Sequence, residues 1–284
     1  MTGAVPVAWG VLGGSEEKPK PHREALRGPA KTAPVADFDD DGVQDVHATG
    51  EFGGAVSVAY GSGKGGSGGD DEEKVRRQRL DLDSPGVPGR EGKGVSFADV
   101  TVPRDVDADG YTDLVASVSV QGKGTEGTHA GLVVLWGSSK GLSDGTYLKG
   151  TPKDYQSTNG DDPLVAGDFT GDGHTDLVVR IGSERGLLKG PFSRDGASSG
   201  SAAVPAAFSD PGNTDQLVGA FAADLNGDRT DDLVSSHATE DDGMGGGEVE
   251  TSYAAGGPEG FREPDTERLP GIDTATVGDV DADG

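Results

Sequence analysis

The sequence predicts an all-β fold built from repeated units of four short antiparallel strands, and three observations lead to this prediction. An acidic pattern recurs along the 284 residues at intervals of 55 to 68 residues. Short apolar runs rich in β-branched residues precede and follow each copy. Further runs alternate apolar and polar residues and end at glycine turns. Period-two alternation between glycine turns is the strand signal, and a repeat of this length indicates a repeat architecture.

The acidic pattern covers nine residues, with oxygen-bearing side chains at positions 1, 3, 5 and 9 and usually glycine at position 6. Four copies are complete, and a fifth is interrupted at Gly284, which suggests truncation. The predicted ligands are these side chains and the backbone carbonyl of position 7. They are Asp37, Asp39, Asp41, Val43 and Asp45; Asp105, Asp107, Asp109, Tyr111 and Asp113; Asp168, Thr170, Asp172, His174 and Asp176; Asp224, Asn226, Asp228, Thr230 and Asp232; and Asp279, Asp281 and Asp283.

The same order of strands is expected in each repeat. One strand enters the acidic loop, a second leaves it, a third ends at a glycine turn, and a fourth follows. First strands are expected at 34–36, 97–102, 163–166, 216–221 and 275–277, second strands at 46–48, 114–118, 177–181 and 233–236, third strands at 55–60, 132–136 and 248–253, and fourth strands at sites such as 78–82 and 146–148. Four short antiparallel strands per repeat are typical of a blade. The sequence therefore predicts a β-propeller.

The predicted organisation is one propeller domain, or a fragment of one, with four whole blades and a partial blade at each end. The blades are placed approximately at 1–30 (partial), 31–93, 94–160, 161–213, 214–272 and 273–284 (partial). The 4–10 stretch predicts a third strand that lacks its loop. In the repeat of Asp168 a glycine turn directly follows the second strand, so its third strand is expected to be shifted or lost. Segments 62–73 and 238–247 are expected to be mobile hairpin loops.

Calcium fits the acidic pattern, because it is a hard cation that takes six to eight oxygen ligands in a flexible shell. Glycine at position 6 permits the sharp turn, and both oxygens of the position-9 carboxylate could bind together. Magnesium prefers an octahedral shell with more water and is the weaker candidate. We expect about four calcium ions, one per complete loop, with the fifth site incomplete.

Two other interpretations of the acidic pattern were weighed. An EF-hand requires Glu at position 12 and flanking helices, but position 12 here lies in strand-like runs and is occupied by Ala48, Ala116, Val179 and Ser235. The remaining alternative is a set of Asp/Gly-rich turns that bind no ion. The Asp224 loop departs furthest from the pattern, since Arg229 replaces the glycine and Asn226 is a neutral ligand.

The composition restricts the partners. A formal net charge of −26 argues against nucleic acid and anionic membrane surfaces and suits cation binding. There are no cysteines, so neither disulfides nor thiolate metal sites are possible. No apolar stretch is long enough for a membrane span, and the N-terminal residues do not form a signal peptide.

At the acidic loops the sequence resembles FG-GAP repeats, the units of the integrin α-subunit propeller and of many bacterial extracellular proteins. The resemblance covers nearly the whole chain, with starts at 3–5 and 54–56 that look like the family's Gly-Ala-Pro region, whereas the Phe-Gly half is poorly kept at Phe97-Ala98. It implies a propeller, calcium between the first and second strands of a blade, a bacterial source, and adhesion or ligand binding outside the cell. The integrin's separate metal-dependent ligand domain has no counterpart here.

The leading hypothesis is a non-enzymatic, calcium-stabilised extracellular or cell-surface propeller that binds an unknown protein or glycan. The alternative is the accessory region of a secreted hydrolase whose catalytic domain lies outside this chain, and a third possibility is a scaffold that binds only calcium. The 61–65 turn lacks the Ser or Thr of a phosphate-binding loop. The basic run 74–79 follows an acidic run and is read as a solvated strand edge, although it could bind an anion. No Ser stands in a Gly-x-Ser-x-Gly motif before a helix, and the five histidines do not have metal-binding spacing.

Overall fold

The computed structural model describes residues 36–49, 54–62, 75–88, 95–121, 128–150, 164–181, 184–205, 208, 216–238, 249–262 and 265–269. The chain divides into two compact units, Met1–Thr32 and Ala33–Gly284, and every described residue belongs to the second. Several expectations concern residues outside the described ones. They are the partial blades at 1–30 and 273–284, the strands at 34–35 and 275–277, Asp279, Asp281, Asp283, and nearly all of the segments 62–73 and 238–247.

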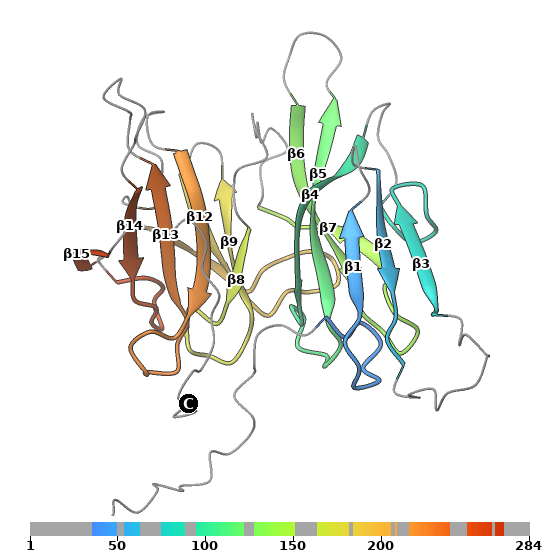
Figure 1. Cartoon of the computed structure of the whole chain (residues 1–284), viewed down its shortest axis with the longest axis horizontal. Coiled ribbons are helices and arrows are strands. Elements are labelled where there is room, and N and C mark those ends of the chain that lie inside the picture. The colour runs from blue at the N-terminus through green and yellow to red at the C-terminus, as the bar shows by residue number, and fades with distance from the viewer. Residues whose placement is uncertain are drawn as a thin grey trace, which may run out of the picture. The chain divides into compact units, whose positions relative to one another are not determined.

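The described residues form four antiparallel sheets, each with its strands in chain order, as Figure 1 shows. Blade 1 contains β1 (Val46–Thr49), β2 (Ala55–Ala59) and β3 (Arg77–Asp81). Blade 2 contains β4 (Val95–Arg104), β5 (Asp113–Gln121), β6 (Thr128–Trp136) and β7 (Ser143–Tyr147). Blade 3 contains β8 (Val165–Gly167), β9 (Asp176–Ile181), β10 (Glu184–Lys189) and β11 (Gly200–Ala203). Blade 4 contains β12 (Gln216–Ala223), β13 (Asp232–Ala238), β14 (Val249–Ala254) and β15 (Asp265–Leu269).

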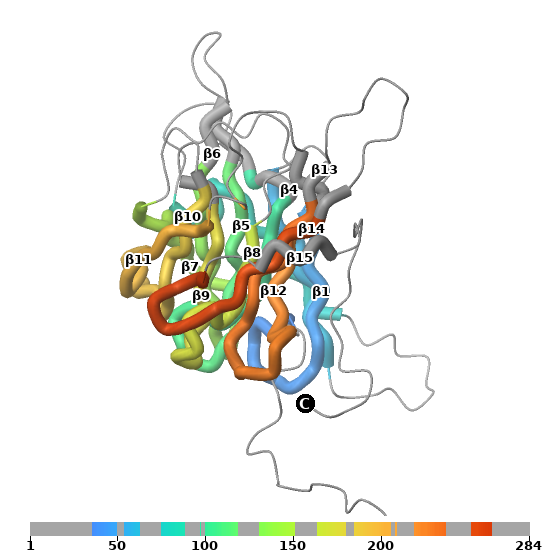
Figure 2. Tube along the Cα trace, turned by 90° about the vertical axis from the view of Figure 1, so that its left-hand side faces the viewer, coloured from blue at the N-terminus to red at the C-terminus, as the bar shows by residue number. Residues whose placement is uncertain are grey.

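The predicted all-β class with four-stranded antiparallel blades is confirmed. The expected second strands correspond to β1, β5, β9 and β13, and the expected third strands to β2, β6 and β14. The chain passes through each sheet as a meander, which can be followed in Figure 2. Among the described residues, no helix is both long and apolar enough to cross a membrane.

One irregularity predicted for blade 3 is resolved. Its third strand is not lost, because β10 pairs with β9, with Leu188 opposite Leu177 and Glu184 opposite Ile181. β10 also pairs with β11, so this blade is complete. The glycine at 186 lies within the strand and not in the turn, since it pairs with both Val179 and Ala203.

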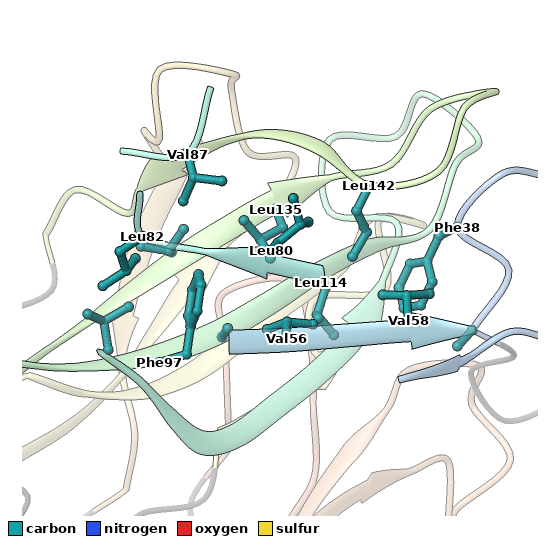
Figure 3. Close-up of a cluster of buried hydrophobic side chains, with 14 of the residues drawn as sticks. Phe38, Val56, Val58, Leu80, Leu82, Val87, Phe97, Leu114, Leu135 and Leu142 are labelled. Carbon is teal, nitrogen blue, oxygen red and sulfur yellow. The ribbon is translucent and has the colours of Figure 1, made fainter. Parts of the chain in front are cut away.

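Strand alternation builds the core between successive blades. Along β5, Leu114 and Ala116 belong to the cluster shared with blade 1, whereas Val115 belongs to the cluster shared with blade 3. Along β9, Leu177 packs toward blade 2 and Val178 toward blade 4. Since successive side chains of a strand point to opposite faces, each inner blade contributes one face to each neighbour. Figure 3 shows the cluster between blades 1 and 2, where Phe38, Val56 and Leu80 meet Phe97, Leu114 and Leu135.

A repeated backbone hydrogen bond links each of the first three acidic loops to the following blade. The position-2 carbonyl of Phe38 accepts from Ser138 N (3.2 Å), that of Val106 from Phe192 N (2.8 Å), and that of Phe169 from Gly257 N (2.9 Å). The side chains of the three accepting residues are also fully or almost fully buried between blades. The acidic loops are therefore part of the junctions between blades.

One such residue is exposed in the first described blade and one in the last. Val46 of β1, which corresponds to the buried Leu114 and Leu177, is 66% exposed, and Leu225 at position 2 of the Asp224 loop is 54% exposed. Within the described part of the chain, each of these two side chains thus lacks the neighbouring blade that covers its counterparts.

Candidate metal centre

Each acidic loop connects the incoming strand of its blade to the outgoing one. We number the loops 1 (37–45), 2 (105–113), 3 (168–176) and 4 (224–232), so that each belongs to the blade of the same number. Loop 2 lies between β4 and β5, loop 3 between β8 and β9, and loop 4 between β12 and β13. In Figure 1 these connections lie at the lower ends of their sheets, together with the loop before β1.

The backbone of each loop turns through two left-handed residues. Position 6 has a φ of 83° at Gly42, 96° at Gly110, 85° at Gly173 and 71° at Arg229. Position 4 is also left-handed, at Asp40, Ala108, Gly171 and Gly227. The position-4 conformation was not predicted, because aspartate and alanine give no glycine signal there.

Carboxylates at positions 1 and 5 accept hydrogen bonds from the backbone of the same loop. In loop 3, Asp168 accepts from Asp172 N (3.1 Å) and Gly173 N (2.8 Å), and Asp172 accepts from His174 N (2.9 Å). Loops 1 and 4 repeat all three contacts, and loop 2 repeats the contacts to positions 6 and 7. These bonds hold the acidic side chains on the inside of the turn.

The position-9 aspartates are buried and hold the loop to the end of the third strand. In loop 2, Asp113 accepts from Val106 N (3.0 Å) with one oxygen and from Gly137 N (2.7 Å) with the other. Asp45, Asp176 and Asp232 each accept from the loop and from the corresponding glycine, which is Gly61, Gly190 or Gly256. At most 1% of each of these four residues is exposed.

The glycine at the end of each third strand has a steric reason that the sequence did not reveal. A Cβ on Gly61, Gly137, Gly190 or Gly256 would collide with the backbone carbonyl of loop position 8 in the same blade. Glycine therefore allows the third strand to approach the loop closely enough for the bond to the position-9 carboxylate.

Burial changes the acidity of these aspartates. Desolvation raises the pKa of Asp113 from 3.8 to about 7, against the opposing effect of hydrogen bonds from Gly137 and Val106. It likewise raises the pKa of Asp176 to about 6, and it raises the pKa of Asp45. Nearby loop carboxylates raise all three further. A buried carboxylate that is costly to ionise is stabilised in its charged form by a cation beside it.

Carboxylate oxygens converge in the first two loops. One oxygen each from Asp37, Asp39 and Asp45 lie within 4.8 Å of one another in loop 1, and one each from Asp105, Asp107 and Asp109 do so in loop 2. Loop 1 therefore brings its position-9 aspartate into the cluster, whereas in loop 2 the cluster consists of positions 1, 3 and 5.

Each of the first three loops also contains a buried oxygen that has no hydrogen-bond partner. These atoms are Asp39 Oδ1, Asp105 Oδ1 and Thr170 Oγ1. Thr170 is only 5% exposed. Since buried polar atoms are nearly always paired, an unpaired oxygen at position 1 or 3 of three loops fits a ligand for a cation. Hard oxygen donors in a flexible turn are the donor set that calcium takes.

Loop 4 is arranged differently. Asn226 Nδ2 lies 3.2 and 3.4 Å from the two carboxylate oxygens of Asp232 and 3.3 Å from the hydroxyl of Tyr253. Tyr253 in turn donates to Asp232 (3.2 Å). Asn226 Oδ1 accepts from Asp228 N (2.9 Å). The inner polar groups of loop 4 thus satisfy one another, which agrees with its departure from the pattern in sequence.

Comparison with known proteins supports the repeat assignment. A family model described as an FG-GAP-like repeat matches residues 105–179, from the start of loop 2 into β9. A search of curated proteins finds no match. The matched stretch contains two of the acidic loops and the junction between blades 2 and 3. Together with the repeated four-stranded blades, this match is consistent with an FG-GAP-like repeat protein.

Proposed function

We propose that this chain is a calcium-binding propeller module in which calcium stabilises the acidic loops and, through them, the junctions between blades. Oxygens of Asp37, Asp39 and Asp45 would hold the ion in loop 1, and those of Asp105, Asp107 and Asp109 in loop 2. Loop 3 would use Asp168, Thr170 and Asp172. Bound calcium would supply the positive charge that offsets closely spaced carboxylates.

The unpaired buried oxygens of loops 1 to 3 carry this proposal. Without a cation, Asp39 Oδ1, Asp105 Oδ1 and Thr170 Oγ1 would each leave a desolvated acceptor unsatisfied, at a cost of about 1–3 kcal/mol per group. Loop 4 has no such atom among those described, because Asn226 and Tyr253 complete its hydrogen bonds. We therefore expect three tighter sites and a weaker fourth.

The acidic loops also favour a binding role over a catalytic one. Their carboxylates are engaged with the loop backbone and with the third strand, and this supports the proposal of a structural metal site. Extracellular calcium modules work at about 10⁻⁴–10⁻³ M calcium, which makes the cell exterior the suitable location. We propose adhesion or ligand binding as the wider role, with a protein or glycan as the partner.

Thermal melting with calcium and with excess EDTA tests the proposal. Each site occupied at 100 times its Kd stabilises the folded state by about 2.7 kcal/mol, so the Tm should fall by several degrees in EDTA. Asp105→Asn should reduce this calcium-dependent difference. Asp144→Asn, which removes the same charge from an exposed position of β7 outside the loops, should leave it unchanged. Equal Tm values of the unmodified chain in calcium and in EDTA would contradict the proposal.

A further inference from the structure

Two arginines reach into the acidic loops from outside them. Arg194, in the turn between β10 and β11 of blade 3, contacts loop 2 of blade 2. Its Nε lies 2.5 Å from Asp107 Oδ2, and a terminal nitrogen lies 2.5 Å from Asp109 Oδ2. The guanidinium also lies over the ring of Trp136, 4.7 Å from its centroid. This arginine therefore links blade 3 to the candidate calcium ligands of blade 2.

The backbone around Arg194 is held in place by blade 2. Trp136 Nε1 donates to Thr146 Oγ1 (3.1 Å), and that hydroxyl donates to the carbonyl of Arg194 (2.9 Å). Two residues later, Gly196 has a φ of 82°, and a Cβ there would collide with the carbonyl of Tyr147. The turn is thus closely docked, and it presents the guanidinium to loop 2.

Arg76 produces the same arrangement at loop 1 from a different place in its blade. It directly precedes β3 and forms an ion pair with Asp39 Oδ2. Its guanidinium lies 3.4 Å from the centroid of the Tyr60 ring, and it donates to the carbonyl of Lys140 in blade 2 (2.6 Å). The other oxygen of Asp39, Oδ1, is the buried unpaired one. The arginine therefore holds one oxygen of the position-3 carboxylate and leaves the second for a cation.

The arginines occur where position 3 is an aspartate. Loops 1 and 2 have Asp39 and Asp107 at position 3, and the third strand of each blade ends in an aromatic residue, Tyr60 or Trp136. Loops 3 and 4 have the neutral Thr170 and Asn226 at position 3 and no aromatic residue before the equivalent glycine. Among the described residues, no arginine from elsewhere in the chain forms an ion pair with loop 3 or loop 4.

The charges at the ligand positions of the four loops become equal when these arginines are included. Loops 1 and 2 each have four aspartates at the ligand positions, whereas loops 3 and 4 each have three. One guanidinium offsets the fourth ligand-position carboxylate of loops 1 and 2, whereas Asp40 of loop 1 adds a negative charge outside the ligand positions. Two arginines at unrelated positions in the sequence each supply this one positive charge to a loop. This recurrence argues against an incidental surface contact.

We propose that Arg76 and Arg194 are built-in counter-cations of loops 1 and 2, which lower the calcium affinity of these loops and hold them formed when calcium is absent. The part concerning affinity rests on the proposed calcium binding. An ion bound to the carboxylate would lie about 5–6 Å from the guanidinium on that carboxylate. Even in water-like surroundings, repulsion at this distance weakens binding about tenfold. Both arginine side chains are 47% exposed, so orientation by these ion pairs contributes less, and the repulsion dominates.

The Arg194→Gln variant tests this role at loop 2. The sequence has two tryptophans, so Trp9→Phe leaves Trp136 as the only one and makes its fluorescence a reporter of loop 2. In that background, Arg194→Gln should bind calcium about tenfold more tightly and should melt at a lower temperature in EDTA. Arg194→Lys keeps the charge and should retain the original affinity. Arg79→Gln removes an equal charge and a comparable surface ion pair with Asp81, away from the loops, and should change neither property.

The outcomes separate the two proposals. Equal calcium affinity and equal melting in EDTA for Arg194→Gln and Arg79→Gln would overturn the counter-cation role. Weaker calcium binding by Arg194→Gln would also overturn it, because orientation would then outweigh repulsion. If no variant binds calcium, the proposed calcium function fails, and a lower Tm of Arg194→Gln in EDTA would still support the structural part of the arginine's role.

Discussion

Replacement of Asp176 by alanine separates the structural role of an acidic loop from its role in metal binding. The carboxylate of Asp176 is fully buried and accepts from Thr170 N (3.0 Å) and Gly190 N (2.8 Å). The substitution leaves both donors without an acceptor, at about 1–3 kcal/mol each. The loss of these two bonds alone would therefore lower the free energy of unfolding by about 2–6 kcal/mol.

Removal of the buried charge offsets part of that loss, and the offset depends on pH. Burial raises the pKa of Asp176 from 3.8 to about 6. The folded state therefore binds the proton more tightly than the unfolded state, and the ionised group costs stability increasingly as the pH rises from 4 to 6. At 1.36 kcal/mol per pKa unit, the cost is about 3 kcal/mol at pH 7 and about 2 kcal/mol at pH 5. In chelator, Asp176→Ala should thus be more destabilising at pH 5 than at pH 7, by about 1 kcal/mol.

Urea unfolding in excess EDTA at the two pH values measures this difference, with Asp172→Ala as the matched control. Asp172 belongs to the same loop but is exposed and accepts from His174 N (2.9 Å). Its loss should cost about 0.5–1.5 kcal/mol in chelator, with a larger effect in calcium because a ligand is removed. If the two variants are equally destabilised in chelator at pH 5, the reasoning about the position-9 aspartate is refuted.

Three further predictions follow from the same contacts. Phe169→Ala should lower the free energy of unfolding by about 3–5 kcal/mol, because Phe169 is fully buried between blades. Leu225→Ala, at the equivalent position that is 54% exposed, should cost less than about 1 kcal/mol. Similar values for the two variants in urea unfolding would contradict the assigned junctions. Calcium affinity, measured by calorimetry, should fall as the pH is lowered from 7 to 5, because a cation in loop 2 favours the ionised form of the neighbouring Asp113, whose pKa burial raises to about 7; affinity independent of pH would count against coupling between this aspartate and the ion. Arg229→Gly should raise the Tm by an amount equivalent to about 0.5–1 kcal/mol, since Arg229 has a φ of 71° where the other loops have glycine, and a lower Tm would show that its side chain makes a stabilising contact.

Local sequence patterns predicted much of the fold. The apolar runs in 132–136 and 114–118 located β6 and β5, because a strand that is packed on both faces is a short continuous apolar run. The spacing of the aspartates also located the loops, since a nine-residue turn has few ways to direct its odd-numbered side chains inward. The third strand of blade 3 was harder to place, because its glycine at 186 resembled a turn residue but is paired within the sheet.

Contacts between distant residues could not be predicted. The hydrogen bond from Gly137 N to Asp113 depends on the approach of a third strand to a loop 24 residues earlier. Arg194 and Asp107 lie in different blades, and neither the turn of Arg194 nor its distance along the chain gives a pattern that would pair them. The spacing of the position-9 aspartates within each loop suggested that they are metal ligands. It did not reveal that both oxygens of these carboxylates already accept backbone hydrogen bonds.

Direct measurement of bound calcium tests the central claim. The chain would be stripped of metal with EDTA, exchanged into chelator-free buffer at pH 7.5, and titrated with calcium by calorimetry. We predict three ions bound per chain at loops 1 to 3 and a weaker fourth at loop 4, with one ion lost in Asp105→Asn. A chain that binds no calcium at millimolar concentration, or binds the same number after Asp105→Asn, would contradict the account.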